Sequence, residues 1–253
     1  MTELNFKQWH DEDFTFNYEF MPSFAQCTPD FNMSWSEILR ITTDKAGEDF
    51  SFRDMGWELL KEKGIFFAVS RISYHVVKMP VYLQAVRLIT WESAPQGPLA
   101  TRNFKLTDRE TGDTLVYGQT LWSIINFAER KMIPAKVFDM RPTPTVVTEF
   151  DGIKPGKISI PAQMETLGTH KIVLSDLDGN GHTNNSKYIN FALDNLPSEF
   201  QQKVVKDLRL NYSKEAMLGE ELEIKGFFNK DENKYTIQGL VGDTSSFECE
   251  LYY

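Results

Sequence analysis

The strongest constraint on the fold is an alternation of apolar and polar residues in the last part of the chain. Apolar residues recur at every second position in the segments 208–212, 222–228, 235–237 and 247–253. An alternation of period two, with short polar turns between the segments, predicts an antiparallel sheet with one buried face. Such a face has to be covered by an apolar element from elsewhere in the chain.

A helix expected at about 185–196 supplies that element. Four apolar residues recur on one stripe with helical spacing, namely Ile189, Ala192, Leu193 and Leu196. Tyr188 and Phe191 make the opposite side apolar as well, and Pro197 ends the helix. A helix that is apolar nearly all round is a buried helix. The sequence therefore predicts an α+β fold in which an antiparallel sheet wraps around a central helix.

The first half of the chain shows a similar order of elements. The segment 34–37, Ser-Trp-Ser-Glu, has the pattern of a capping box, and 51–54 is a weaker second helix start. Strand-like segments follow, and a hairpin turn is expected at 110–113. The expected strands are 65–77, 81–91, 103–108 and 115–125.

A weak internal repeat supports two copies of the same domain. The segment 71–74, Arg-Ile-Ser-Tyr, matches 209–212, Arg-Leu-Asn-Tyr, and each opens a strand after a helical region. Several Pro and Gly residues between the halves indicate a connection rather than a core element. We predict domains at 1–140 and 163–253, joined by a linker at 141–162.

Composition limits the partners that the chain can have. It holds 27 Lys and Arg against 36 Asp and Glu, a net charge of −9 that disfavours duplex nucleic acid. No apolar run approaches the ~20 residues of a membrane span, and the N-terminus lacks the apolar core of a signal peptide. Cys27 and Cys249 lie outside any metal-ligand spacing and are expected as reduced thiols rather than as a disulfide. We expect a cytoplasmic protein without metal or cofactor, either a monomer that pairs its own domains or a homodimer.

The densest polar cluster is the segment 176–185, directly before the predicted helix. It holds two carboxylates, three amides and a histidine. Two non-catalytic interpretations are open. The segment could be a polar loop with an Asx cap at Asn184 or Asn185. It could also be a calcium loop, but the glycine and the distal Glu that such a loop requires are not at the required positions. His10, His75 and His170 lie in no such cluster and are expected to be structural. Spacing alone leaves a catalytic loop and an ordinary polar loop equally open.

The segment 174–189 resembles the signature of acyl-acyl carrier protein thioesterases, the plant plastid enzymes and their bacterial relatives. The family pattern D-L-D-x-N-x-H-x-N-N-x-x-Y is met at every fixed position from Asp176 to Tyr188. Segments 65–71 and 120–134 resemble the first half of that family. The resemblance implies a tandem pair of hot-dog domains, with the acyl chain held by the first and the chemistry in the second.

Carried over by position, the resemblance implies the catalytic residues Asp178, Asn180, His182 and Glu215. Many plant members have a cysteine directly after that glutamate, where this chain has Ala216, so a thiol mechanism is unavailable there. A carboxylate can activate water or attack the thioester itself. The N-terminus of the predicted helix, with free backbone N–H groups, suits a developing oxyanion.

Three further groups of residues are expected to bind the substrate. Acyl-chain contacts are expected from Met33, Trp35, Ile38 and Leu39, and further substrate contacts from Asn184 and Asn185. Docking of the acidic acyl carrier protein is expected at Arg130, Lys131, Lys187 and Lys214. Release of the free fatty acid would end chain elongation in fatty acid biosynthesis. The alternatives are an acyl-CoA thioesterase, a hot-dog hydratase or dehydratase, and a non-catalytic acyl-binding protein.

Overall fold

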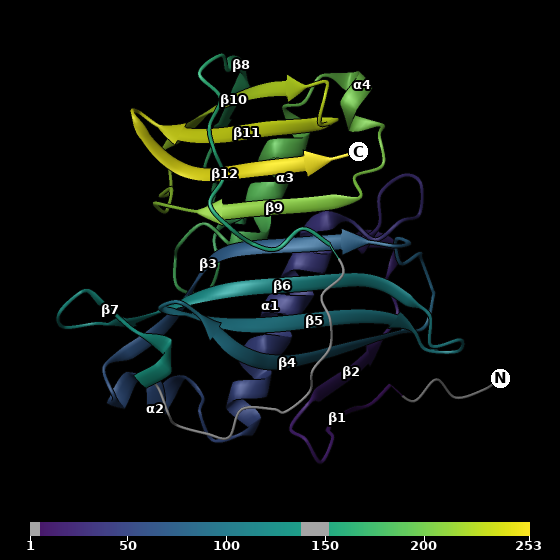
Figure 1. Cartoon of the computed structure of the whole chain (residues 1–253), viewed down its shortest axis with the longest axis vertical. Helices are drawn as coiled ribbons and strands as arrows, with labels where there is room; N and C mark the ends of the chain where they lie inside the picture. Colours follow the sequence, from purple (N-terminus) through teal and green to yellow (C-terminus); the bar gives the residue numbers. More distant parts are fainter. Residues whose placement is uncertain (1–5, 138–151) are drawn as a thin grey trace. The chain divides into compact units, whose positions relative to one another are not determined.

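The structure is a computed structural model that describes residues 6–137 and 152–253. The chain divides into two compact units (Figure 1). The first comprises Met1–Val69 and Val76–Asp151, and the second comprises Ser70–His75 and Gly152–Tyr253. The long strand β3 (Ile65–Val76) therefore contributes its middle part to the second unit. No helix in the described part of the chain is long and apolar enough to cross a membrane.

The first unit is an antiparallel sheet around the helix α1 (Trp35–Phe52). The strand order is β1-β2-β4-β5-β6, with β7 paired to β6. These strands are β1 (Gln8–His10), β2 (Phe16–Phe20), β4 (Val86–Gln96), β5 (Leu99–Asp108), β6 (Thr114–Asn126) and β7 (Lys131–Ile133). The short helices are η1 (Phe24–Gln26), α2 (Trp57–Glu62) and η2 (Ala135–Val137). Apolar residues of α1, such as Ile38 and Leu39, are buried in the core because they recur on one face of the helix.

The second unit repeats this arrangement around the helix α3 (Tyr188–Asp194). Its strand order is β8-β10-β11-β12-β9, with Arg71–His75 of β3 paired antiparallel to β9. The strands are β8 (Glu165–Lys171), β9 (Asp207–Tyr212), β10 (Glu221–Asn229), β11 (Lys234–Val241) and β12 (Thr244–Tyr252). The short helices are η3 (Leu174–Asp176), η4 (Asn185–Lys187) and α4 (Ser198–Gln201). The predicted α+β class and the helix wrapped by antiparallel strands are confirmed: each unit is a hot-dog domain.

The two units repeat one another with a constant offset of 150 residues before and into the central helix. The turn η1 corresponds to η3, and the bridge Cys27–Met33 corresponds to the bridge Leu177–Thr183. Backbone hydrogen bonds match as well. The bonds Thr28 N–H to Asn32 C=O and Asp178 N–H to His182 C=O both measure 2.8 Å. This repeat is stronger than the four-residue match seen in the sequence.

The structure corrects several predicted boundaries. The helix expected at 185–196 begins as the 3₁₀ turn η4, and α3 ends at Asp194. Ser34 is the N-cap of α1 but makes no side-chain capping bond, so the capping box does not form. The second helix start at 51–54 is wrong, because α1 continues to Phe52 and α2 begins after Gly56. β4 begins only at Val86 because residues 81–85 form a turn region.

The strands β1, β2 and β8 were not predicted. β2 does alternate apolar and polar residues over Phe16–Phe20, but the run spans only five residues and was overlooked. β8 is a largely polar edge strand. The predicted linker at 141–162 lies partly outside the described residues. Its described end is bound to the second unit, where Ser73 Oγ donates to the carbonyl of Ile153, and Arg209 Nη2 donates to that of Lys157 at 3.2 Å.

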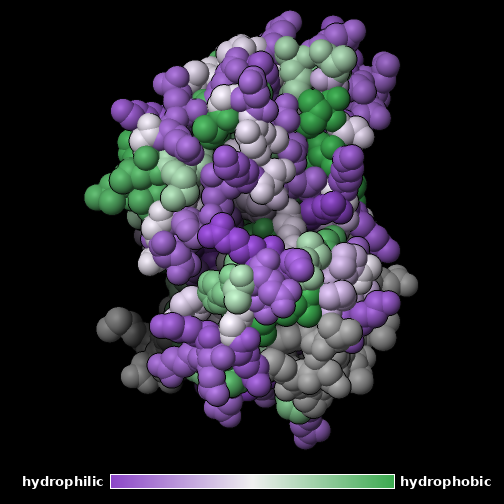
Figure 2. Space-filling view, turned by 90° about the vertical axis from the view of Figure 1, so that its left-hand side faces the viewer, coloured by the Kyte–Doolittle hydropathy of each residue, from purple (hydrophilic) through white to green (hydrophobic). Residues whose placement is uncertain are grey.

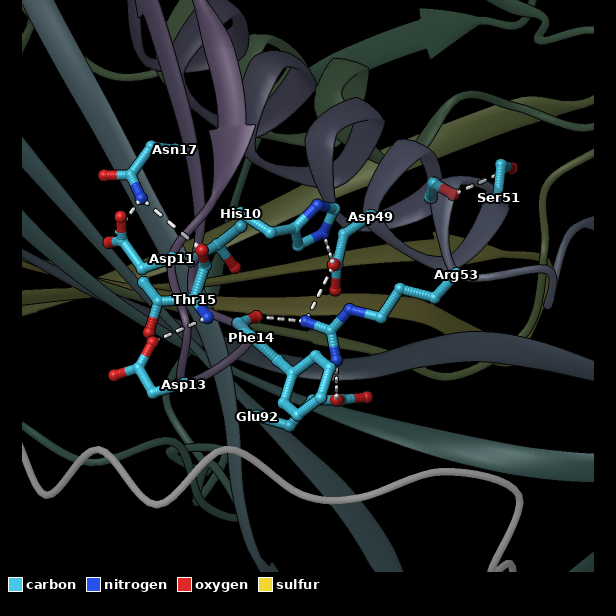
Figure 3. Close-up of polar contacts among 12 residues, drawn as sticks. His10, Asp11, Asp13, Phe14, Thr15, Asn17, Asp49, Ser51, Arg53 and Glu92 are labelled. Atoms are coloured by element: carbon cyan, nitrogen blue, oxygen red, sulfur yellow. Dashed lines mark hydrogen bonds and ion pairs between the residues drawn. The ribbon is translucent and has the colours of Figure 1, made fainter.

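A buried ionic network in the first unit ties the N-terminal strand to α1 (Figure 3). Asp49 is fully buried, and its carboxylate lies 2.8 Å from His10 Nε2, 2.8 Å from Arg53 Nη2 and 2.6 Å from Arg102 Nη2. Glu92 lies 3.5 Å from Arg102. His10 is thus a structural residue, as expected from its sequence context. Burial alone would raise the pKa of Asp49, but the charge and hydrogen bond of Arg102, with those of its other partners, hold it below its usual value.

We expect Asp49→Asn to destabilise the first unit by about 3–5 kcal/mol, because it leaves buried cations without their counter-charge. Because the folded-state pKa of Asp49 is lowered, its contribution is present above about pH 4 and is lost as the pH falls further. Denaturant unfolding at several pH values measures both effects. The matched control is Asp44→Asn, since Asp44 pairs with Arg40 on the exposed side of α1 and should cost less than about 1 kcal/mol. Equal losses in the two variants would contradict the role given to the network.

Candidate active site

The loop that carries Asp178 and His182 is closed by its own backbone. Besides the bridge between Leu177 and Thr183, the N–H of Gly181 donates to the carbonyl of Asp178 at 3.0 Å. Asp178 Oδ1 accepts from the backbone N–H of Asn180 at 2.8 Å and of His182 at 3.3 Å. Gly181 has a φ of +79°, in the left-handed region that glycine adopts without strain. Oδ1 of Asp178 therefore stabilises the conformation of the loop.

His182 meets Glu215, which lies in the segment that follows β9. His182 Nδ1 is 3.3 Å from Glu215 Oε1, and the two side chains are 44% and 59% exposed. Substrate can therefore reach both. Asn180 is exposed within the same loop as Asp178 and His182. The structure thus brings His182 into contact with Glu215, while Asp178 is bonded to the backbone of His182 in the same loop, and the catalytic role of all four residues stays a prediction.

A second pair anchors the base of this loop. His170 Nε2 lies 2.9 Å from Oδ2 of the buried Asp176, which also accepts from the N–H of Val173 at 3.0 Å. The carbonyl of Asp176 accepts from the N–H of Asn184 at 2.8 Å, and the His170 ring stacks on Phe191 of α3 at 3.9 Å between centroids. His170 is therefore structural, as expected. The sequence contained Asp176 in its motif but gave no sign of its partner.

The start of the helix is occupied by its own cap. Asn184 Oδ1 accepts from the backbone N–H and from Oγ of Ser186, both at 2.9 Å, and the N–H of Lys187 donates to the carbonyl of Asn184 at 2.9 Å. The carbonyl of Asn185 accepts from the Tyr212 hydroxyl at 3.0 Å. The expectation that this helix start offers free N–H groups is wrong for Ser186 and Lys187. The Asx cap at Asn184 is confirmed.

The residues expected to hold the acyl chain belong to the core of the first unit. Met33, Ile38 and Leu39 are at most 2% exposed, and Trp35 is 7% exposed. They precede or lie on the buried face of α1. A binding role for them stays a prediction.

The basic residues expected to dock a carrier protein are divided between the units. Lys187 and Lys214 lie in the second unit, within the motif and beside Glu215. Arg130 and Lys131 lie in the first unit, where Lys131 is 77% exposed and 3.7 Å from Glu129. Docking at these residues stays a prediction.

An apolar rim beside the site was not predicted. Four apolar residues of the second unit are between 44% and 77% exposed: Val173, Leu174, Met217 and Leu218. The two stretches are joined because the N–H of Gly219 donates to the carbonyl of Ile172, and the N–H of Ile172 to that of Glu220, both at 2.9 Å. Figure 2 shows that on one face of the molecule hydrophobic side chains gather in separate areas within a mostly hydrophilic surface. We call these four residues the apolar rim.

Neither cysteine of the chain lies in the loop of Asp178 and His182 or beside Glu215. Cys249 is buried in β12 and Cys27 is half-buried in the first unit, and burial raises the pKa of both thiols. Ala216, beside Glu215, is fully buried. Within the residues that the structure describes, no cluster of three or more His, Cys, Asp or Glu side chains is arranged to hold a metal ion.

Comparison with known proteins gives one consistent family. A family model described as the acyl-ACP thioesterase N-terminal domain matches residues 15–139, and one described as the C-terminal domain matches residues 162–246. The chain is 28% identical over 163 residues to a chloroplast palmitoyl-acyl carrier protein thioesterase of Arabidopsis thaliana. It is 26% identical over 170 residues to a chloroplast oleoyl-acyl carrier protein thioesterase of the same plant. These matches cover 61% and 62% of this chain but only 39% and 46% of the relatives.

Solved structures share the whole fold. An acyl-ACP thioesterase of Bacteroides thetaiotaomicron superposes with a TM-score of 0.82 at 22% identity, covering 95% of this chain and 98% of that one. A 12:0-ACP thioesterase of Umbellularia californica superposes with a TM-score of 0.76 at 17% identity, covering 96% and 98%. At these identities the likeness shows the fold.

The left-handed glycine of the loop yields a stability test. We expect Gly181→Ala to destabilise the protein by about 1–2 kcal/mol, because an L-residue is strained at this φ. Gly179→Ala in the same loop is the control, since Gly179 is not in that region and a Cβ there would meet open space. We expect it to change the free energy of unfolding by less than about 0.5 kcal/mol. Denaturant unfolding measures both, and an effect of equal size at Gly179 would refute this account of the loop.

Proposed function

The chain belongs to the acyl-ACP thioesterase family, and on that premise we propose that it hydrolyses the thioester of a fatty acyl-acyl carrier protein. The products are the free fatty acid and the carrier thiol, so the reaction ends chain elongation in fatty acid biosynthesis. The observation that carries the proposal is the contact of His182 with Glu215 beside Asp178. These residues come from separate segments and meet at an accessible place, which an ordinary polar loop does not require.

The chemistry needs a nucleophile, a stabiliser for the oxyanion and a proton for the leaving thiolate. Asp178 Oδ1 is held by two backbone N–H groups, which orients the carboxylate and leaves Oδ2 outside those bonds. We assign Asp178 as the nucleophile or as the base for water. Glu215 contacts Nδ1 of His182, so Nε2 is the ring nitrogen available to the substrate. Asn180 is assigned to the thioester carbonyl.

Two routes balance. In the first, Asp178 removes a proton from water and the resulting hydroxide attacks the carbonyl carbon. The carbon–sulfur bond then breaks as the thiolate takes up the proton that Asp178 removed. In the second, Asp178 attacks directly and forms an anhydride as the thiolate leaves, after which water cleaves the anhydride with Glu215 as the base. Asp178 acts in both routes, as the base in the first and as the nucleophile in the second.

Removing either carboxylate charge should abolish most of the activity. Asp178→Asn and Glu215→Gln keep the shape of the side chain, and each should lower kcat by about 10²-fold or more, as for a lost general base. The control is Glu221→Gln, an exposed carboxylate on β10. The measurement is release of free thiol from acyl carrier protein loaded with a fatty acyl group. Full activity of Glu215→Gln would exclude this site.

Isotope labelling separates the two routes. A single turnover with excess enzyme in ¹⁸O water places label in the Asp178 carboxylate if an anhydride forms and water attacks it at the Asp178 carbonyl carbon. Direct attack by water places label only in the released fatty acid. The modified peptide and the fatty acid are both analysed by mass spectrometry.

We propose that the acyl chain is held by the first unit, whose copy of the loop has Thr28 and Asn32 in place of Asp178 and His182. Ile38→Phe fills core space on α1 and should shift the preference towards shorter acyl chains without abolishing hydrolysis. A panel of acyl-carrier substrates of different length measures the shift. The control is Leu208→Phe, an equally buried position in the second unit. An unchanged preference in Ile38→Phe would place the acyl chain elsewhere.

We propose that the acidic carrier protein docks on Lys187 and Lys214, with Arg130 and Lys131 of the first unit as further contacts, and that the apolar rim contributes apolar surface. If the attraction is electrostatic, kcat/KM for the carrier-linked substrate falls with added salt, because surface charges are screened within about 10 Å at 0.1 M. Lys214→Glu should lower it further, and Lys230→Glu in an exposed turn should not. The same acyl group on pantetheine should show little response to salt. A flat response for the carrier-linked substrate would remove this proposal.

The alternatives differ in their products. An acyl-CoA thioesterase releases thiol from coenzyme A esters in preference to carrier-linked ones, and a hydratase changes the acyl chain without releasing thiol. A non-catalytic binding protein leaves the thioester intact. One panel of carrier, coenzyme A and unsaturated acyl thioesters, assayed for free thiol and for hydration, distinguishes them.

A further inference from the structure

The segment that carries Glu215 is exposed except at one residue. Residues 213–215 and 217–219 are exposed, whereas Ala216 between them is fully buried. The segment is tied at its ends, where the N–H of Ser213 donates to the carbonyl of Ser246 and that of Gly219 to the carbonyl of Ile172, both at 2.9 Å. Ser246 Oγ also donates to the carbonyl of Lys214 at 2.7 Å. Between these ties, the position of Glu215 depends on how Ala216 is held.

Both backbone polar groups of Ala216 are bound by side chains of the motif. Thr183 Oγ1 donates to the carbonyl of Ala216 at 2.5 Å, and the N–H of Ala216 donates to the Tyr188 hydroxyl at 3.1 Å. Thr183 and Tyr188 are each 2% exposed. Thr183 directly follows His182, and Tyr188 begins α3, with its ring packed against Phe247 at 5.3 Å between centroids. Ala216 therefore links the segment that carries Glu215 to the loop that carries His182.

The first unit provides an internal comparison. At the offset of 150 residues, Met33 stands where the second unit has Thr183, and Ile38 stands where it has Tyr188. Both are fully buried and apolar. The first unit ties its loop with a backbone bond instead, from the N–H of Met33 to the carbonyl of Pro80 at 2.7 Å. Burying a hydroxyl costs free energy unless the hydroxyl is hydrogen-bonded. At these two equivalent positions, hydroxyls occur only in the unit that carries Glu215.

We propose that Thr183 and Tyr188 form a clamp on Ala216 that positions Glu215 against His182. They are positioning residues, because they act through Glu215 and are bonded to the protein backbone rather than to substrate. The clamp also accounts for Ala216, whose side chain is enclosed and takes no part in the chemistry. The kinetic test of this inference rests on the proposed function. The spectroscopic test does not depend on the proposed function.

The kinetic test is a double-mutant cycle with Glu215→Gln. Thr183→Val and Tyr188→Phe keep the shape and lose the hydroxyl. Each should lower kcat by about 10-fold to 10²-fold with little change in KM, because the geometry of the reacting groups is disturbed and binding is not. In the Glu215→Gln background the same substitutions should have almost no further effect. Thr183→Ser keeps the hydroxyl and should retain most of the activity.

Controls separate positioning from simple loss of structure. Tyr235→Phe removes a hydroxyl from another buried tyrosine of the second unit and should leave kcat unchanged. Thermal unfolding is followed for every variant, and Thr183→Ser keeps the test valid if Thr183→Val does not fold. Equal losses of kcat with and without Glu215, or a rise of KM alone, would overturn the proposal.

The spectroscopic test needs no turnover. The ring nitrogen signals of His182, followed by NMR at fixed pH, should change in Glu215→Gln because the carboxylate contact is lost. They should change in the same direction in Thr183→Val and Tyr188→Phe, and stay as in the parent protein in Tyr235→Phe. If the parent protein hydrolysed no acyl thioester, the proposed function would fail while this result still decided the clamp. Unchanged His182 signals in both clamp variants would overturn it.

Discussion

The burial of α3 by its sheet is the constraint on which the site depends. Because α3 is apolar on nearly all sides, the sheet has to enclose it, and the chain on either side of the helix has to lead into strands of that sheet. The loop before α3 and the segment after β9 are brought together in this way, linked by the bond of Thr183 to Ala216. The meeting of His182 with Glu215 is therefore a consequence of core packing and is not a local property of the motif.

The repeated loop shows how one backbone serves two purposes. Both copies have the same turn, bridge and backbone bonds, so the shape itself does not require catalytic residues. At the left-handed position the second unit has Gly181, while the first has Phe31 with a φ of +61°. The catalytic candidates are substitutions on a shape that the fold already supplies, since Thr28 and Asn32 occupy the places of Asp178 and His182. The ionic network around Asp49 has its separate role in the first unit, where it joins β1 to the helix.

The sequence predicted the elements in which apolar residues recur with the spacing of a strand or of a helix. Alternation predicted β9 to β12, and helical spacing predicted α3, although the 3₁₀ turn η4, with Asn184 as its N-cap, precedes the α-helix. β2 was overlooked although its five residues alternate, and β8 was missed because it is a polar edge strand. The motif indicated Asp178 and His182, but the hydrogen bonds that Ala216 makes with Thr183 and Tyr188 link residues distant in sequence. Such contacts depend on how the sheet closes around the helix, which no local pattern contains.

The exposed pair His182 and Glu215 depends on buried hydrogen bonds for its position. Two charges 4 Å apart attract by only about 1 kcal/mol in water, and exposed ion pairs typically contribute about 0.2–1 kcal/mol. Fixing the backbone of a single residue costs about 1–2 kcal/mol. The contact between His182 and Glu215, roughly half exposed on both sides, is thus too weak to order the segment that carries Glu215. The order has to come from hydrogen bonds shielded from water. Among the described residues these are the two bonds at the fully buried Ala216 and the bond from the buried Ser246 Oγ to the carbonyl of Lys214.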